Sequence, residues 1–185
     1  MQPTRSLVSP TSHPQLEHEL AEMLRRRRAS GGSLGQLEPL ALRLGLMQRT
    51  LKPHFSDPQL LIFAADHGIA VEGLCPPEAP LTHQLVERLL GGHVPLAGFA
   101  RAQQLELTVV DCGVAADLHA HDRLLMRKIA HGTRNARLTA AMSADQCQAA
   151  MRAGMQLGYR LRGNFSIFAS LGVGADFTAA LVLSR

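Results

Sequence analysis

Three short apolar runs, each followed by a polar turn, dominate the alternation of hydrophobic and polar residues along the chain. They cover residues 61–65, 104–111 and 165–171. Strands buried on both faces of a parallel sheet read as nearly continuous apolar runs of this length. An acid, a histidine or a glycine follows each run, as in Asp66-His67-Gly68. We therefore predict parallel strands whose carboxyl ends carry ligand-binding groups along one rim.

Helical spacing marks the segments before and between these strands. Apolar residues recur every three or four positions in residues 14–28, 34–47, 82–90, 96–101 and 143–161. Thr82 is predicted to cap one of these helices, and Ser143-Ala144-Asp145-Gln146 has the form of a capping box that opens another. We expect the inner face of the helix over residues 143–161 to consist of Cys147, Met151, Met155 and Leu161, and we expect another helix to begin over residues 177–183.

This pattern predicts an α/β fold with a Rossmann-like parallel sheet flanked by helices. Residues 1–13 are rich in Ser, Thr and Pro without any period, so we expect a disordered tail there. Residues 14–50 form an N-terminal helical segment outside the sheet, and residues 51–185 form the α/β domain. An open sheet of this kind leaves an exposed edge strand, which favours association with another chain.

Composition narrows the possible partners. Hydrophobic residues make up 46% of the 185 residues but aromatic ones only 4%, with no Trp, so the core must be aliphatic. Much of the net charge of +4 lies in the run Arg25 to Arg28, which reads as a solvated helix end. Basic residues are not spread over a face and aromatics for base stacking are scarce, so we predict no nucleic-acid partner.

Cysteine usage gives no sign of a metal or a disulfide framework. The three cysteines, Cys75, Cys112 and Cys147, are an odd number at long spacing. His119-Ala120-His121 has no third ligand at a recognisable spacing, so we interpret it as a surface loop. No apolar stretch is long enough to cross a bilayer. We predict a cytoplasmic protein without metal or cofactor.

Residues at the rim suit small-molecule binding better than acyl transfer. Asp66 and His67 are adjacent, so their side chains diverge and form no dyad simply by being neighbours, and no Gly-x-Ser-x-Gly elbow is present. His67 is either a ligand-binding or a structural residue.

Gly132-Thr133-Arg134-Asn135 offers donors for a ribose or an oxyanion, although a turn needs similar residues. Gly172-Val173-Gly174 suits a strand-to-helix turn that holds a phosphate, with Asp176 turned away to cap the helix.

Four ordered blocks resemble the nicotinate-nucleotide:dimethylbenzimidazole phosphoribosyltransferase family. Gly32-Ser33-Leu34-Gly35-Gln36-Leu37-Glu38 is similar to an early G-S-L-G-x-L-E, and the segment from Phe63 to Gly73 is similar to F-A-x-D-H-G-V-x-x-E-G. The segment from Val109 to Asp117 resembles V-V-D-x-G-V-x-x-D. Gly132-Thr133-Arg134-Asn135 with Ala141-Met142-Ser143 resembles G-T-x-N-x-x-x-x-P-A-M-T. Together the matches cover roughly residues 20 to 185.

The resemblance implies transfer of the 5-phosphoribosyl group of nicotinate mononucleotide to 5,6-dimethylbenzimidazole. The product is α-ribazole 5′-phosphate, which is used for the lower ligand of cobalamin. The resemblance also implies a homodimer that needs no metal. Gln84 matches a glutamine beside the benzimidazole pocket of the family. We expect these residues to bind substrate: Asp66, His67, Gly68, Cys75, Gln84, Gly132, Thr133, Asn135, Gly172, Gly174 and Asp176.

Three departures from the family pattern keep other functions open. Cys75-Pro76-Pro77 replaces an S-x-Y that supplies an aromatic wall, and Ser170 stands where the family has a glutamate. We expect the C-terminal part of the family fold, with its phosphate loop and catalytic glutamate, to be missing from this chain, so we assign no catalytic residue. The alternatives are a short transferase that is active alone or with a second polypeptide that supplies the rest, a non-catalytic relative that binds a benzimidazole or a nucleotide, and an inactive remnant.

Overall fold

The computed structural model describes residues 10–76 and 78–184, and all structural statements below concern these residues. The chain folds as two compact units that divide between His54 and Phe55. Of the predicted tail, residues 1–9 lie outside the described part, and residues 10–13 form no helix or strand.

Two helices make up the N-terminal unit, as the spacing predicted. They are α1 (Pro14–Gly31) and α2 (Leu37–Gln48). The Nδ1 atom of His13 accepts a hydrogen bond from the amide of Leu16 and caps α1. Leu20 is buried against α2 at Gly45, where an added Cβ would stand 2.7 Å from the Leu20 methyl groups. The absence of a side chain at Gly45 therefore lets the two helices approach closely.

Glu38 joins the end of α1 to the start of α2. Its carboxylate is paired with the guanidinium of Arg28 and accepts hydrogen bonds from the Ser33 hydroxyl at 3.2 Å and the Leu34 amide at 3.0 Å. The hydrogen bond from Arg28, followed by that from the Leu34 amide, lowers the pKa of Glu38 to about 2. The charged carboxylate is thus the form that holds the turn between the helices.

We expect acid to loosen the N-terminal unit before it affects the α/β unit. The pKa of Glu38 falls from 4.5 to about 2 on folding, so its contribution to stability is present above pH 4.5 and is lost as the pH drops toward 2. Protection factors of the α1 and α2 amides, which compare each exchange rate with the intrinsic rate at the same pH, measure this loss between pH 6 and pH 2. In Glu38→Gln these protection factors should already be low at pH 6 and should change little on acidification. If Glu38→Gln showed the same exchange profile as the wild type, Glu38 would not have this role.

Residues from Phe55 onward form a four-stranded parallel sheet with the order β3-β2-β1-β4. The strands are β1 (Gln59–Ala65), β2 (Glu106–Gly113), β3 (Leu124–Met126) and β4 (Ser166–Leu171). The α/β class and the three predicted strands are confirmed. Strand β3 was missed, because three residues in a polar connection are too few for a periodic signal. Only pairing with Val109, Val110 and Asp111 makes them a strand.

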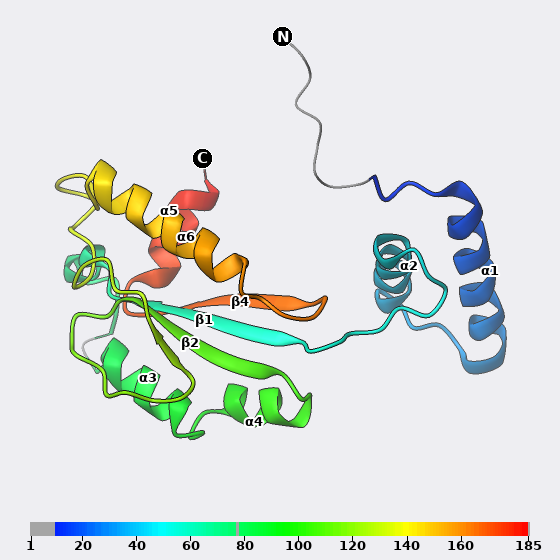
Figure 1. Ribbon diagram of the computed structural model, residues 1–185, viewed down its shortest axis with the longest axis horizontal. Coiled ribbons are helices and arrows are strands. Elements are labelled where there is room, and N and C mark those ends of the chain that lie inside the picture. The colour runs from blue at the N-terminus through cyan, green and yellow to red at the C-terminus, as the bar shows by residue number, and fades with distance from the viewer. Residues whose placement is uncertain (1–9, 77, 185) are drawn as a thin grey trace, which may run out of the picture. The chain divides into compact units, whose positions relative to one another are not determined.

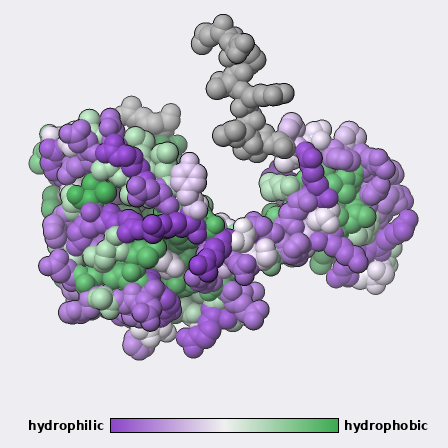
Figure 2. All heavy atoms as spheres, viewed as in Figure 1, coloured by the Kyte–Doolittle hydropathy of each residue, from purple (hydrophilic) through white to green (hydrophobic). Residues whose placement is uncertain are grey.

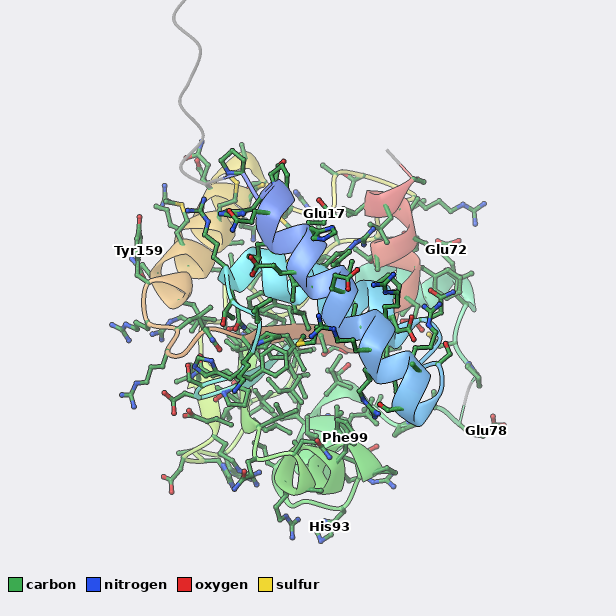
Figure 3. All side chains as sticks on the ribbon, turned by 90° about the vertical axis from the view of Figure 1, so that its right-hand side faces the viewer. Glu17, Glu72, Glu78, His93, Phe99 and Tyr159 are labelled. Carbon is green, nitrogen blue, oxygen red and sulfur yellow. The ribbon has the colours of Figure 1, made fainter. Side chains whose placement is uncertain are left out.

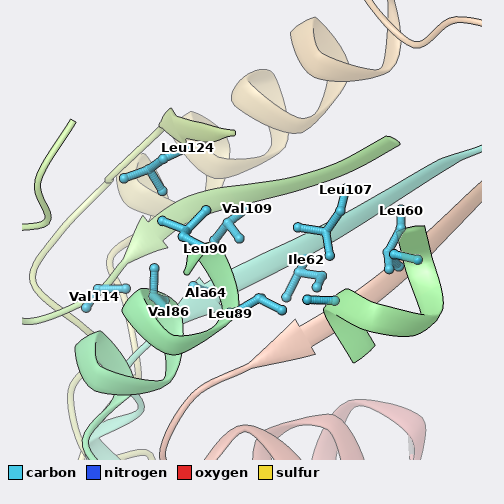
Figure 4. Packing of buried hydrophobic residues seen from close by; sticks show 12 residues of the cluster. Leu60, Ile62, Ala64, Val86, Leu89, Leu90, Leu107, Val109, Val114 and Leu124 are labelled. Carbon is cyan, nitrogen blue, oxygen red and sulfur yellow. The ribbon is translucent and has the colours of Figure 1, made fainter. Parts of the chain in front are cut away.

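Helices cover both faces of this sheet (Figure 1). They are α3 (Thr82–Leu90), α4 (Pro95–Ala102), α5 (Ala144–Gly158) and α6 (Ala175–Leu183), and a short 3-10 helix spans Gly68–Glu72. Figure 1 shows α3 and α4 beneath the sheet and α5 and α6 above it. Ile62 and Val109 pack with Val86 and Leu89 on the α3 side (Figure 4), while Leu61 and Val110 pack with Leu157 on the α5 side. The described buried hydrophobic residues are all aliphatic, as composition predicted.

The inner face of α5 differs from the prediction. Met151 and Met155 are 58% and 61% exposed and Cys147 is also exposed, while Leu157 is buried and Leu161 packs against the core. Figure 3 shows Tyr159 pointing outward at the end of this helix. The residues of α5 that face the sheet are mostly Ala and Gly. The large methionine side chains, which were expected on this inner face, lie on the solvent-exposed face instead. This arrangement leaves open space beneath α5.

Apolar residues remain exposed at the β4 edge of the sheet and on α6. Phe168 on β4 is 61% exposed, and Val182 and Leu183 on α6 are 71% and 86% exposed. On the face shown in Figure 2, hydrophobic and hydrophilic residues are intermixed over the α/β unit. None of the helices in the described residues has the length and apolar character needed to span a membrane.

Candidate functional site

Three loops meet at the carboxyl ends of the strands, at the rim that the sequence predicted. The amide of Asp66 donates to the carbonyl of Gly113, the last residue of β2, at 3.0 Å. The amide of His67 donates to the carbonyl of Val173 after β4 at 3.2 Å. The Thr133 amide donates to the Asp66 carbonyl at 3.1 Å. The loop after β1 is therefore fixed on both sides by the neighbouring strand ends.

Asp66 uses its carboxylate to join these loops. One oxygen accepts from the Thr82 hydroxyl, and the other accepts from the Ala115 amide at 2.7 Å. The Thr82 oxygen in turn accepts from the amide of Val173 at 3.0 Å. Thr82 is not the cap of α3, contrary to the prediction. Leu81 is the N-cap, and Thr82 lies one residue inside the helix with its hydroxyl turned to the rim.

Removing the Thr82 hydroxyl should loosen the rim. Thr82 is 1% exposed, so Thr82→Val keeps the shape but leaves the Val173 amide without its acceptor and Asp66 without a donor. Each unsatisfied buried group costs about 1–3 kcal/mol. We expect a loss of that order in urea unfolding. Thr82→Ser keeps the hydroxyl and should cost clearly less. A loss in Thr82→Ser as large as that in Thr82→Val would show that the hydroxyl contributes no more to stability than the methyl group.

A second set of contacts joins the loop after β1 to the Gly132–Asn135 segment. The amide of Gly68 donates to the Thr133 hydroxyl at 3.1 Å, and a Cβ on Gly68 would lie 2.5 Å from the Thr133 carbonyl oxygen. The Asn135 amide group donates to Glu72, which also pairs with Arg137. These two hydrogen bonds lower the pKa of Glu72, the one from Asn135 most. Gly68 and Asn135 thus have a structural use in addition to the binding role predicted for them.

Beneath the rim lies a buried ion pair that sequence reasoning missed. Asp111, at the end of β2, is fully buried and accepts from the amides of Gly113 and Val114 at 3.0 and 2.8 Å. Its other oxygen lies 3.5 Å from the ammonium of Lys128, which also donates to the carbonyl of Ala116. The strand-end position of Asp111 was visible in the sequence. Lys128 was not, because it comes from a loop with no periodic pattern.

Two of the cavities at the rim gather several of the predicted site residues. The first, the α5 cavity, has a volume of about 240 Å³ and lies between α5 and the upper face of β1 and β2. Its described lining consists of Phe63, Ala65, His67, Val110, Cys112, Gly113, Arg127, Ile129, Ala130, Gly132, Thr133, Met142, Gln146, Ala150, Ala153, Gly154 and Leu157. His67, Gly132 and Thr133 are the predicted site residues that it brings together.

The second, the Cys75 cavity, also has a volume of about 240 Å³ and lies between the proline-rich loop and the turn after β4. Its described lining is Leu74, Cys75, Pro76, Ala79, Pro80, Leu85, Gly172, Val173, Gly174, Asp176 and Phe177. Four predicted site residues therefore meet here: Cys75, Gly172, Gly174 and Asp176.

Two details at the Cys75 cavity differ from expectation. Gly174, not Asp176, is the N-cap of α6, and the Asp176 side chain makes no cap hydrogen bond. Asp176 is instead exposed and lines the cavity. Gln84 lines neither cavity, and its side-chain oxygen accepts from the Leu81 amide at 3.1 Å at the start of α3.

His67 lies close to both cavities. A Cβ on Gly174, in the Cys75 cavity, would be 3.1 Å from the His67 Cβ, and His67 is also among the residues that line the α5 cavity. The Nδ1 atom of His67 is buried and has no hydrogen-bond partner among the described residues. Burial lowers the pKa of His67 and outweighs the opposing charge of Asp66. In the same cavity, burial and then the charge of Asp111 raise the pKa of the Cys112 thiol to about 11, so it stays protonated.

Neither cavity has the donors of a metal centre. Within residues 10–76 and 78–184, no group of three or more His, Cys, Asp or Glu side chains is placed to hold a metal ion. His119 and His121 are both exposed, which agrees with the surface loop predicted for them.

Comparison with known proteins places these features in a family. A family model described as phosphoribosyltransferase matches residues 10–185. A nicotinate-nucleotide–dimethylbenzimidazole phosphoribosyltransferase of Janthinobacterium sp. (strain Marseille) is 40% identical over 173 residues, which are 94% of this chain and 50% of the relative. The corresponding protein of Variovorax paradoxus is 42% identical over 154 residues, 83% of this chain and 44% of the relative. The chain thus spans about half the length of the curated relatives it matches.

Solved structures agree with the sequence matches. The crystal structure of nicotinate-nucleotide-dimethylbenzimidazole phosphoribosyltransferase from Thermus thermophilus has a TM-score of 0.74 and 29% identity, and covers 92% of this chain and 54% of that one. A second structure of the enzyme from this organism has a TM-score of 0.73 at 30% identity. The resemblance carried by the four sequence blocks is confirmed: this chain belongs to the phosphoribosyltransferase family whose relatives are named for transfer between nicotinate nucleotide and dimethylbenzimidazole.

Proposed function

We propose that this chain binds the substrates of a phosphoribosyl transfer from nicotinate mononucleotide to 5,6-dimethylbenzimidazole. The observation that carries the proposal is the Cys75 cavity, where the proline-rich loop meets the glycine turn after β4 at the strand rim. Ligands of open parallel sheets bind at the carboxyl ends of the strands. A cytoplasmic location, and association with a second copy or a completing chain, belong to the same proposal.

The lining of the Cys75 cavity has groups suited to the base and to the ribose of the proposed substrates. Leu74, Leu85 and Phe177 offer apolar and aromatic surface for a flat base. Phe177 takes on this role although the Cys75-Pro76-Pro77 loop lacks the aromatic residue of the family pattern. The carboxylate of Asp176 accepts hydrogen bonds from ribose hydroxyls, whereas it would repel a phosphate placed directly on it.

A second candidate, a binding module without catalysis, is favoured because the described lining of the Cys75 cavity offers no carboxylate besides Asp176. Proton removal from the azole needs a general base, and Asp176 is the group assigned above to the ribose hydroxyls. Ser170 replaces the glutamate of the family pattern and does not line this cavity. Turnover measurements on the same sample separate transfer from binding alone.

Calorimetric titration with each substrate, followed by a turnover assay, tests the proposal. Phe177→Ala should weaken binding of 5,6-dimethylbenzimidazole about tenfold, because it removes an aromatic contact worth about 0.5–1.5 kcal/mol together with buried area. Phe168→Ala is the matched control, since Phe168 is exposed on β4 and outside the cavity. Asp176→Asn should weaken the binding of nicotinate mononucleotide. Asp145→Asn, which changes another exposed aspartate, is the control. Absence of binding of both ligands to the wild-type chain would overturn the proposal.

A further inference from the structure

The α5 cavity has walls that are mostly hydrocarbon. Phe63 on β1 and Val110 on β2 line it from the sheet, and Ala150 and Leu157 line it from α5. An apolar cavity of about 150 Å³ accepts benzene. The volume of about 240 Å³ here therefore leaves room for a second fused ring, or for a small polar group beside one ring. A ligand of this cavity would thus have an apolar, flat body.

Arg127 is the charged side chain in the described lining of this cavity. It follows directly after β3 and is half-buried. Its guanidinium donates to the carbonyl of Met126 at 2.7 Å and has no ion-pair partner within the described residues. A guanidinium carries five N–H donors in a planar fork, which matches the two oxygens of a carboxylate. Most of these donors have no acceptor in the part of the chain that the structure describes.

No negative charge in the described lining opposes Arg127. The lining residues given above include neither Asp nor Glu. Burial and then the charge of Asp111 raise the pKa of the Cys112 thiol to about 11, and burial lowers the pKa of His67, so both side chains are neutral at pH 7.5. Asp111 is itself paired with Lys128. The cavity therefore offers a ligand one positive charge and hydrocarbon walls.

We propose that the α5 cavity binds an apolar monocarboxylate, whose aromatic body lies between the sheet and α5 and whose carboxylate pairs with Arg127. A neutral hydrocarbon would leave the guanidinium without a partner. A ligand with two negative charges would bring one that the lining does not balance. The site does not depend on the function proposed for the Cys75 cavity, since the described linings of the two cavities share no residue.

Calorimetric titration at pH 7.5 with 2-naphthoate and with its neutral isostere 2-naphthamide tests the charge pairing. We expect the carboxylate to bind about tenfold more tightly, near the lower limit for a hydrogen bond to a charged group, because water reaches part of Arg127. Equal binding of the two probes would overturn the pairing with Arg127. Binding of neither probe would overturn the site.

Variants of Arg127 assign the preference to its guanidinium. Arg127→Met keeps an apolar side chain of similar length, so it should abolish the preference for the carboxylate and change the binding of 2-naphthamide little. Arg127→Lys retains the charge and should keep most of the preference. Arg152→Met is the matched control, since Arg152 is exposed on α5 and outside the cavity. If Arg152→Met weakened 2-naphthoate as much as Arg127→Met does, the preference would reflect net charge and not this site.

A pair of glycine variants locates the aromatic body. Gly154 and Gly158 both lie in α5 with no atom within 4 Å of an added Cβ, but only Gly154 lines the cavity. Gly154→Leu should weaken 2-naphthoate about tenfold by filling the space, and Gly158→Leu should change it less than about twofold. In methyl NMR the Ala150 and Ala153 signals should shift on binding, whereas Ala79 reports on the Cys75 cavity. Shifts at Ala79 alone would refute the α5 site.

Benzoate and nicotinate separate this site from the proposed transfer reaction. They share one shape and one carboxylate, but the ring nitrogen of nicotinate loses its hydration among hydrocarbon walls. We expect benzoate to bind in the α5 cavity about threefold more tightly than nicotinate, or more. Tighter binding of nicotinate, with shifts of the Ala150 and Ala153 methyl signals, would assign the cavity to the transfer reaction and overturn a separate site for apolar carboxylates.

Discussion

Lys128→Met should destabilise the α/β unit by about 3–5 kcal/mol, because it leaves a buried carboxylate without its counter-ion. Asp111 is fully buried, and the ammonium of Lys128 is 3.5 Å from the oxygen that receives no hydrogen bond within the described residues. The variant also removes the donor to the Ala116 carbonyl. Urea unfolding monitored by circular dichroism measures the loss.

Two further variants separate the buried charge from other effects of the substitution. Asp117 lies 3.9 Å from Lys128 but is 98% exposed, so Asp117→Asn should change stability by less than about 0.5 kcal/mol. The double variant Lys128→Met/Asp111→Asn should be more stable than Lys128→Met alone, since the unpaired charge is gone. If the double variant loses as much stability as Lys128→Met and Asp111→Asn lose together, the ion pair is not the source of the stability.

Gly172→Ala is the other change for which we expect a large effect. Gly172 has a φ of +154°, and an added Cβ would overlap the carbonyl oxygen of Ala65 at the end of β1. Backbone strain and overpacking together cost about 2–6 kcal/mol. The substitution should also displace the turn that lines the Cys75 cavity, so substrate binding falls along with stability. Thermal unfolding and calorimetric titration measure the two effects.

Gly98→Ala is the matched control for the glycine turn. Gly98 lies within α4, and no atom would meet its Cβ within 4 Å. Alanine has a higher helix propensity than glycine by about 1 kcal/mol, so this variant should be slightly more stable than the wild type. A similar loss from Gly98→Ala and Gly172→Ala would mean that the turn has no special requirement for glycine.

Much of the candidate site was predictable because its residues follow strands directly. Asp66, His67 and Gly68 come at once after β1, and Gly172 and Gly174 follow β4. Parallel strands place such residues at one rim whatever the rest of the fold does. Phe177 was not identified as a site residue, since an apolar residue at the start of a helix has no pattern that separates a cavity wall from core packing.

The sequence by itself determined the α/β class, the aliphatic core and the rim, since period, composition and strand ends are local properties of the chain. Only the tertiary structure decided that Thr82 bonds to Asp66, that Lys128 pairs with Asp111, and that Met151 and Met155 face solvent. These outcomes depend on which distant segments become neighbours. Small residues on the inner face of α5 and short pairings such as β3 acquire their roles from packing, which no local pattern encodes.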